Sequence, residues 1–184
     1  MNVGANELRA ILGAYKQVMD ASWPSLHPAM AARSTKWPTA SENELKQELA
    51  AYLAEASGPR CRVRLFWKFT PGFVFGGCNA LFARDAGVAS SANVVGTDDS
   101  HKQFPWKSQA AKYRADDQNV VNRGVPMLDI VERQQSPSGE ITWVRVGKTP
   151  IRVAGGNIIG VFGMYEVLDP EIGGKLFVER LKHP

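Results

Sequence analysis

The sequence predicts an α+β fold in which helices come first and strands dominate the rest of the chain. Before residue 59 the apolar side chains recur at helical spacing, whereas after Pro59 they alternate with polar side chains, as a half-buried strand requires. Three more strand-like runs, separated by turn sequences, follow towards the end of the chain. The expected order is therefore two helices, two strands, further helices and an antiparallel three-strand meander.

The composition indicates one packed domain with an additional helical segment. The chain has 184 residues, of which 44% are apolar and 22% are charged, as in an ordinary globular protein. No run approaches the roughly 20 apolar residues that span a bilayer. The first ten residues also lack the basic and apolar blocks of a signal peptide. We therefore expect a cytoplasmic protein without a membrane partner.

The net charge of +4 is a weak indication of a nucleic-acid partner. The densest basic stretch falls at alternate positions of a predicted strand and comprises Arg60, Arg62, Arg64 and Lys68. Because alternate positions share one face of a strand, we interpret these side chains as a solvated strand face. A nucleic-acid partner is accordingly not expected.

Two amphipathic helices are predicted within residues 1–59. The first begins at Glu7 with Asn6 as its cap, and the second follows the capping box formed by Ser41 and Glu44. Proline-containing turns connect them. Each helix has an apolar stripe that must be buried on the following domain or on a second copy of the chain. A homodimer formed through this extension is therefore predicted.

The elements after residue 60 are delimited by turn residues. Strands are predicted around Val63–Phe69 and at Phe73–Phe75, the second ending at Gly76-Gly77, and Asn79 is expected to cap a short helix. A longer helix should end before the helix-stopping Gly124. The predicted bounds of this helix and of the three later strands are 109–123, 127–134, 141–151 and 158–168.

This order of elements resembles that of the PAS family, and short sequence words support the resemblance. They occur in order as Trp67-Lys68, Cys78 to Ala83, Val95 to Asp98, Pro105-Trp106, Tyr113 to Asp117, Gly124 to Pro126 and Lys148 to Ile151. The resemblance implies a five-stranded antiparallel sheet with helices on one face. It divides the chain into an N-terminal helical extension (1–59), a PAS domain (60–169) and a C-terminal tail (170–184) that can form a short helix.

The resemblance further implies a sensory module with a ligand-binding cavity between the sheet and the helices. Strand parity and residue type suggest the candidate lining residues Phe75, Asn79, Trp106, Tyr113, Met127, Val144, Phe162 and Met164. Asn79 and Tyr113 are the expected polar contacts. For each candidate, an ordinary position in the hydrophobic core is the alternative interpretation.

Some members of the family bind haem or flavin, so each cofactor is considered in turn. Haem would need an axial ligand, for which His101 is the candidate because the helix over residues 109–123 has no histidine. Flavin photochemistry in this family uses a cysteine within an Asn-Cys-Arg-Phe word, whereas this chain has Cys78-Asn79. Flavin is therefore not expected, and no cofactor is assigned.

Catalytic constellations are not evident in the sequence. Asp98-Asp99 and Asp116-Asp117 are acidic pairs, but adjacent residues do not face one another on a helix. No enzyme activity is predicted. The leading hypothesis is a sensory module that binds a small apolar or aromatic ligand and signals through dimer contacts or a separate partner. A ligand-free dimerisation or adaptor module and a haem-based gas or redox sensor are the alternatives.

Overall fold

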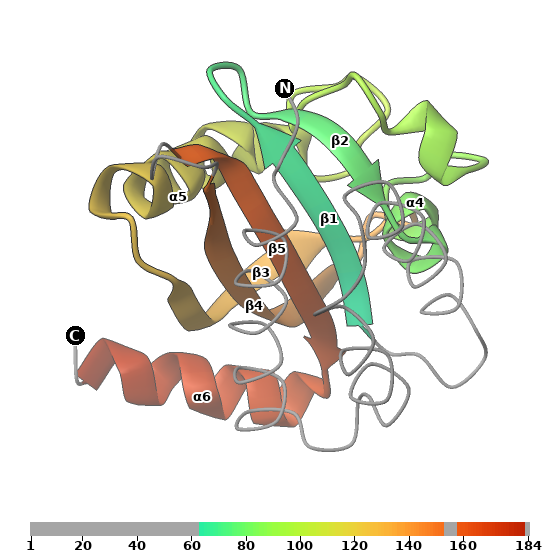
Figure 1. Cartoon of the computed structure of the whole chain (residues 1–184). Helices are drawn as coiled ribbons and strands as arrows, with labels where there is room; N and C mark the ends of the chain where they lie inside the picture. Colours follow the sequence, from blue (N-terminus) through green and yellow to red (C-terminus); the bar gives the residue numbers. More distant parts are fainter. Residues whose placement is uncertain (1–62, 153–157, 183–184) are drawn as a thin grey trace, which may run out of the picture.

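A five-stranded antiparallel sheet organises the computed structural model of the chain, which describes residues 63–152 and 158–182 (Figure 1). The strand order across the sheet is β2-β1-β5-β4-β3. The sheet confirms the predicted fold class. The predicted helices and dimer contacts of residues 1–59 lie outside the described residues, as does the turn predicted at 154–157.

The predicted order of strands and helices is confirmed throughout the described region. Its elements are β1 (Val63–Phe69), β2 (Val74–Cys78), α4 (Ala80–Asp85), η2 (Ser91–Asn93), η3 (Lys107–Gln109), α5 (Ala110–Arg123), β3 (Met127–Gln135), β4 (Ile141–Arg152), β5 (Ile158–Leu168) and α6 (Pro170–Lys182). Helix α5 ends at Gly124, whose φ of 64° is the left-handed conformation that glycine adopts most readily. The local stop signals of the sequence therefore set these bounds well.

Strand β2 differs from its prediction, because Gly76 and Gly77 lie inside the strand instead of ending it. A Cβ atom on either glycine would collide with the indole ring of Trp67 on the neighbouring strand β1. The neighbouring aromatic ring therefore leaves no room for a larger residue at these two positions. The chain does not turn there.

The two faces of the sheet pack against different elements. On β1, Phe66 contacts Phe82 of α4, whereas Trp67 points to the opposite face and stacks with Phe162 of β5. Leu65 and Phe66 are both buried, at 1% and 5% exposure, so neither face of this strand is solvated. Alternation along β1 thus separates two buried faces.

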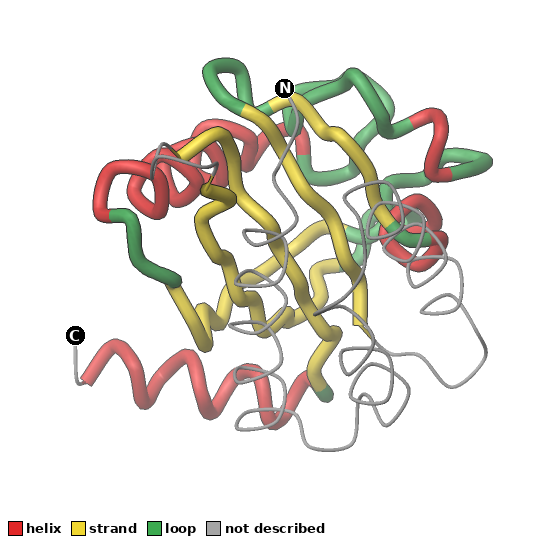
Figure 2. The backbone as a smooth tube through the Cα atoms, in the orientation of Figure 1, coloured by secondary structure: helices red, strands yellow, loops and turns green. Residues whose placement is uncertain are grey.

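Helix α6 packs against the face of β4 opposite to α4 and α5. Gly173 lies on the side chain of Trp143, and the ring of Phe177 lies 5.0 Å from the Trp143 ring. The next residue, Val144, points to the other face and joins the core beneath α4. Figure 2 shows α5 and α6 near different ends of the sheet.

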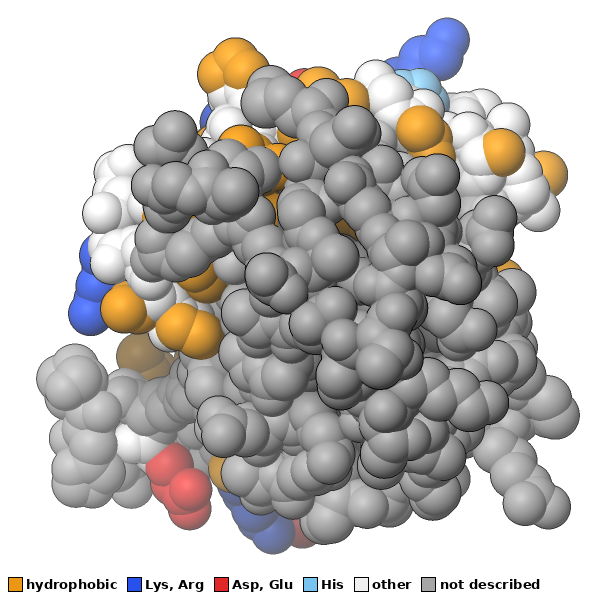
Figure 3. Space-filling model, in the orientation of Figure 1, with side chains coloured by type: hydrophobic (Ala, Val, Ile, Leu, Met, Phe, Trp, Pro, Cys, Tyr) orange, Lys and Arg blue, Asp and Glu red, His pale blue; other side chains and the backbone are white. Residues whose placement is uncertain are grey.

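The described surface carries separate hydrophobic side chains, some of which are visible at the rim of the face in Figure 3. Three of the more exposed ones, Ile172, Val178 and Leu181, belong to α6. None of the helices in the described part of the chain has the length and apolar character needed to cross a membrane.

Candidate functional site

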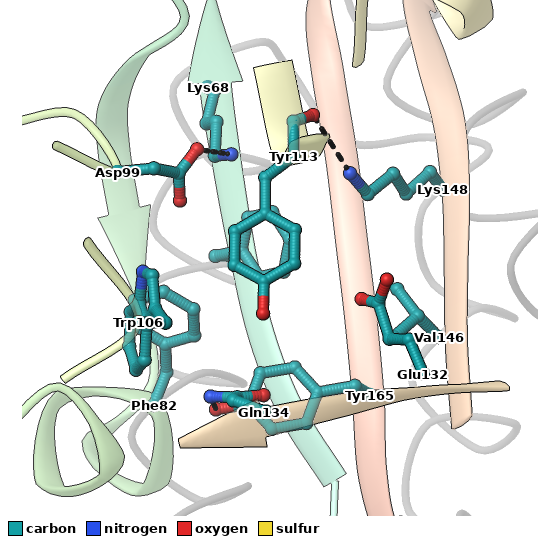
Figure 4. Close-up of a pocket in the computed structure, with 11 residues that line it drawn as sticks. Lys68, Phe82, Asp99, Trp106, Tyr113, Glu132, Gln134, Val146, Lys148 and Tyr165 are labelled. Atoms are coloured by element: carbon teal, nitrogen blue, oxygen red, sulfur yellow. Dashed lines mark hydrogen bonds and ion pairs between the residues drawn. The ribbon is translucent and has the colours of Figure 1, made fainter. Parts of the chain in front are cut away.

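A cavity lies between the sheet and the covering segments that include α4 and α5 (Figure 4). Its empty volume is about 350 Å³, part of which is continuous with solvent. The room within it for the centres of water molecules is only about 30 Å³, enough for about two waters, so the lining side chains nearly fill the cavity and a larger ligand would have to displace some of them. The lining residues are Phe66, Lys68, Phe82, Asp99, Trp106, Tyr113, Glu132, Gln134, Val146, Lys148 and Tyr165.

Aromatic rings form one wall of the cavity. The ring of Phe82 lies 5.0 Å from that of Phe66 and 5.4 Å from that of Trp106. Phe75 and Phe104 pack behind this wall, at 5.3 Å from Phe82 and 5.2 Å from Trp106 respectively. The ring planes are inclined to one another by 40° to 64°, so the rings interlock into a packed apolar wall.

A buried charge cluster forms the opposite corner and joins three elements and one loop. Lys68 of β1 donates to Asp99 in the loop before η3 at 2.5 Å and to Asp117 of α5 at 2.7 Å. Lys148 of β4 donates to the second oxygen of Asp117 at 2.6 Å. Asp117 is fully buried, and Lys68 is 1% exposed. Two ammonium groups thus face two carboxylates away from water.

The proximity of these groups shifts their pKa values. Burial acts to lower the pKa of Lys68, but the Asp99 and Asp117 carboxylates outweigh it and raise that pKa. Burial acts to raise the pKa of Asp117, but the Lys68 and Lys148 ammonium groups outweigh it and lower that pKa. The two shifts agree, and both groups are charged at neutral pH.

A second set of polar groups lies along β3 and β5. Glu132 pairs with Lys112 of α5, and Gln134 donates to the Tyr165 hydroxyl at 3.2 Å. That hydroxyl in turn donates to Asp85 of α4 at 3.1 Å. Burial, with Asp85 nearby, raises the pKa of Tyr165, so the hydroxyl stays protonated. Arg64 donates to the same Asp85 carboxylate at 2.7 Å.

Among the described residues, one buried group of the lining has no hydrogen-bond partner. The Trp106 side chain is 2% exposed, and its indole N–H is buried without a hydrogen-bond partner. In Figure 4 the indole nitrogen lies at the end of the ring nearest Asp99. Buried donors are normally paired because an unpaired one costs free energy.

Of the eight candidate lining residues, the structure places Trp106 and Tyr113 at the cavity. The Tyr113 hydroxyl donates to Gln109 at 3.1 Å, and burial raises its pKa. Phe75 and Val144 belong to the core cluster behind the lining, and Met127 packs near Val120 in a second cluster. These three residues support the cavity from outside.

The other three candidates lie away from the cavity for separate reasons. Asn79 caps α4, accepts from the backbone N–H of Leu65 at 3.1 Å and donates to the Val63 carbonyl at 2.9 Å. Phe162 and Met164 lie on β5 opposite Trp67 and Leu65, on the other face of the sheet. Strand parity predicted that these two side chains face the cavity, but on β5 the cavity face carries Tyr165.

Sequence reasoning missed nine of the lining residues, and the charged ones are the most informative. The interpretation of the basic stretch as a solvated face is wrong for Lys68, which is buried between two carboxylates. Arg64 is largely buried as well and pairs with Asp85. Polar residues recur at alternate positions of β1, β3 and β4. In a sheet whose two faces are both covered, such residues lie on a buried face, so this pattern could have indicated a polar cavity lining.

The cofactor candidates lie outside the lining. His101 is near Phe104, with ring centroids 5.0 Å apart, and does not line the cavity. Cys78 lies in the core cluster, where burial raises the pKa of its thiol to about 12. Within residues 63–152 and 158–182, no group of three or more His, Cys, Asp or Glu side chains is arranged to hold a metal ion.

A five-stranded antiparallel sheet whose helices enclose a cavity on one face is the architecture of the PAS fold, and the described residues have this fold. No protein-family model matches the sequence, and no curated protein matches it. Solved structures do match. VqmA bound to DPO is 20% identical, with a TM-score of 0.54, and the match covers 66% of this chain and 57% of that one.

Two further solved structures support the same fold. An RNA-binding Light-Oxygen-Voltage receptor is 18% identical with a TM-score of 0.58, and the match covers 78% of this chain and 38% of that one. The PAS domain of a Colwellia psychrerythraea protein is 14% identical with a TM-score of 0.51, covering 67% and 96% respectively. The chain thus spans little more than half of VqmA and less of the receptor. At these identities the likeness establishes the fold.

Proposed function

We propose that this chain is a sensory module that binds a small, flat, ring-containing molecule in the cavity beside Trp106 and Tyr113. The observation that carries the proposal is the combination of a fixed aromatic wall with a few placed polar groups, which is typical of small-molecule sites. The similarity to VqmA bound to DPO supports it, because a protein of this fold holds a small ligand.

The cavity chemistry limits what can bind. The Phe66, Phe82 and Trp106 rings favour an apolar ring that packs against their inclined faces and edges, whereas the buried ions and Gln134 require polar atoms at the edge of the ligand. A purely aliphatic ligand would leave those polar groups desolvated. The ligand is therefore aromatic or conjugated, with heteroatoms on its rim.

Signalling is proposed to leave the cavity through Tyr165. Its hydroxyl links Gln134 at the cavity to Asp85 of α4, and Asp85 also holds Arg64 at the start of β1. A ligand that displaces Gln134 would alter the contact between α4 and β1. Strand β1 follows directly on residues 1–62, so dimer or partner contacts made there would respond.

Native mass spectrometry and absorbance of freshly purified protein test the proposal first. We expect extra non-covalent mass without a haem or flavin band, and the native mass also reports the dimer. DPO is then titrated as a defined probe, with calorimetry as the readout. A haem or flavin band would replace this proposal with a cofactor-based sensor.

A larger side chain placed in the cavity tests the site, and the same substitution outside the cavity is the matched control. Val146→Phe places a ring in the lining, and Val167→Phe places the same ring at a 41%-exposed position on β5. Binding of the co-purified ligand or of DPO should disappear in the first variant and persist in the second, with circular dichroism confirming that both fold. Absence of any bound species, together with no response to DPO, would favour the ligand-free adaptor.

A further inference from the structure

The face of the sheet opposite to the cavity is apolar and buried along its central strands. Strand register brings Leu65 of β1 opposite Met164 of β5, and Trp67 opposite Phe162, with which its ring stacks. On β4, Thr149 lies beside Phe162 in the same row. Six residues of this outer face are at most 4% exposed, namely Val63, Leu65, Thr149, Ile151, Phe162 and Met164. The outer face is therefore as well shielded from solvent as the core on the cavity side.

The described helices do not account for this burial. Helices α4 and α5 and the segment between them pack on the cavity face, through Phe82, Trp106 and Val120. Helix α6 packs on Trp143, which in an extended strand lies about 20 Å along β4 from Thr149. Figure 1 shows α6 across the end of the sheet at which β5 finishes. Because side chains stand roughly perpendicular to a sheet, the neighbouring strands do not shield their tips.

The cover therefore comes from elsewhere in the same chain. The exposed fractions are those of one chain, so a second copy is not needed to explain them. Outside the described residues the chain has three segments, which are residues 1–62, 153–157 and 183–184. The second joins β4 to β5, and the third is too short to cover three strands. Residues 1–62 are long enough.

The predicted helix that precedes β1 matches this face in length and in pattern. Over residues 42–57 it would be about 24 Å long, and the seven residues of β1 span about 23 Å. The connection over residues 58–62 spans at most about 20 Å, so the helix can return along β1. Its apolar stripe consists of Leu45, Leu49, Tyr52 and Leu53, whereas Gln47 falls on the opposite side.

We infer that the outer face of β1, β5 and β4 is the docking surface for the helix predicted over residues 42–57 of the same chain. The apolar stripe of this helix was expected to be buried on its own domain or on a second copy, and burial within one chain favours its own domain. A homodimer would then form through other surfaces. The inference goes beyond the proposed function, because it concerns the face opposite to the cavity and needs no ligand.

A spin label on the solvent side of this helix tests the docking in the full chain. Gln47→Cys carries the label in a chain that also has Cys61→Ser. Cys78 stays unlabelled, because its thiol is buried and has a pKa of about 12. The methyl groups of Leu65 and Met164 should lose most of their NMR intensity, since paramagnetic broadening falls steeply with distance.

Dilution shows which molecule carries the helix. Mixing the labelled protein with an excess of unmodified, isotopically silent chain should leave the broadening of Leu65 and Met164 unchanged. Loss of the broadening on dilution would assign the helix to a second copy, and absence of broadening from the start would place it elsewhere; either result overturns the inference. The matched control is a label at Asn122→Cys, exposed near the end of α5, which should leave Leu65 unbroadened.

A substitution within the stripe provides a second measurement. Leu49→Asp should release the helix, so that a soluble paramagnetic agent broadens the methyl group of Met164, a residue that is 0% exposed in the intact fold. Gln47→Asp, on the solvent side, should leave Met164 protected. Equal protection of Met164 in two variants that both fold, as judged by circular dichroism, would contradict the docking. If Leu49→Asp fails to fold, the spin-label experiment still decides.

Discussion

At the scale of single residues, Asp117 ties the covering helix to the sheet. Each of its carboxylate oxygens accepts from a different lysine, Lys68 on β1 and Lys148 on β4, and the residue is fully buried. Removing one partner from such a cluster leaves a buried charge uncompensated, which commonly costs about 3–5 kcal/mol. Lys68, Asp99 and Lys148 of this cluster also line the cavity, so the ions that stabilise the fold border the proposed ligand site.

The lowered pKa of Asp117 predicts a loss of stability in acid. Because the folded pKa lies below the unfolded value of 3.8, the stabilisation is complete well above that value and is lost as pH falls through the folded pKa. Asp117→Asn should lower the free energy of unfolding at neutral pH by about 3–5 kcal/mol. It should also make the acid limb shallower, by up to about 1.4 kcal/mol per pH unit.

Urea unfolding at a series of pH values measures both effects. The control is Glu171→Gln, which removes a carboxylate whose side chain is 77% exposed and, among the described residues, pairs only with the exposed Lys175 on α6. This variant should change stability by less than about 1 kcal/mol. If the two variants have the same stability and the same acid limb, the buried cluster does not have the role assigned to it.

At the scale of elements, docking of α6 depends on one of two adjacent glycines. A Cβ on Gly173 would collide with Trp143, whereas a Cβ on Gly174 meets no atom within 4 Å. Both changes to alanine raise helix propensity by about 1 kcal/mol. Gly174→Ala should therefore stabilise the domain by up to about that amount. Gly173→Ala should destabilise it by about 1–3 kcal/mol through overpacking.

Thermal and urea unfolding of the two alanine variants provide the comparison. Near-ultraviolet circular dichroism adds a readout of whether the contact between α6 and Trp143 is disturbed. Equal stabilisation by both substitutions would mean that α6 does not pack on β4 through Gly173.

At the scale of the whole molecule, the Tyr165 hydroxyl is expected to couple the cavity to the start of β1. Tyr165→Phe keeps the ring but removes the hydrogen bonds to Gln134 and Asp85. With saturating ligand, hydrogen exchange at α4 and the start of β1 should change in the unmodified chain. The change should be much smaller in the variant, although the affinity for the ligand falls by less than about tenfold.

The same exchange experiment has an outcome that would contradict this coupling. An identical response of α4 and β1 in both proteins would show that the signal does not pass through Tyr165. Ser138→Ala, in the turn between β3 and β4, is a suitable control because its hydroxyl contacts only exposed groups near Ser136 and Glu140. The homodimer predicted from residues 1–59 stays a prediction that native mass can test.

Within the described residues, the sequence by itself determined the order of the strands and helices and the extent of most of them. Gly124 stops α5, Asn79 begins α4, and a nearly continuous apolar run marks β5, because these signals act between residues that are close in the chain. Where a local signal had a distant cause, the prediction was wrong. Gly76 and Gly77 resemble a turn, but their small size accommodates Trp67.

Only the tertiary structure decided which face of the sheet borders the cavity and which charges meet there. Lys68 lies 31 residues from Asp99 and 49 from Asp117 in the sequence, and each side chain alone has the pattern of a solvated residue. Burying one such ion is costly, and only the arrival of its partners from other elements offsets that cost. Packing across the fold therefore set the polar character of the site, because no local pattern records which distant charge will be present.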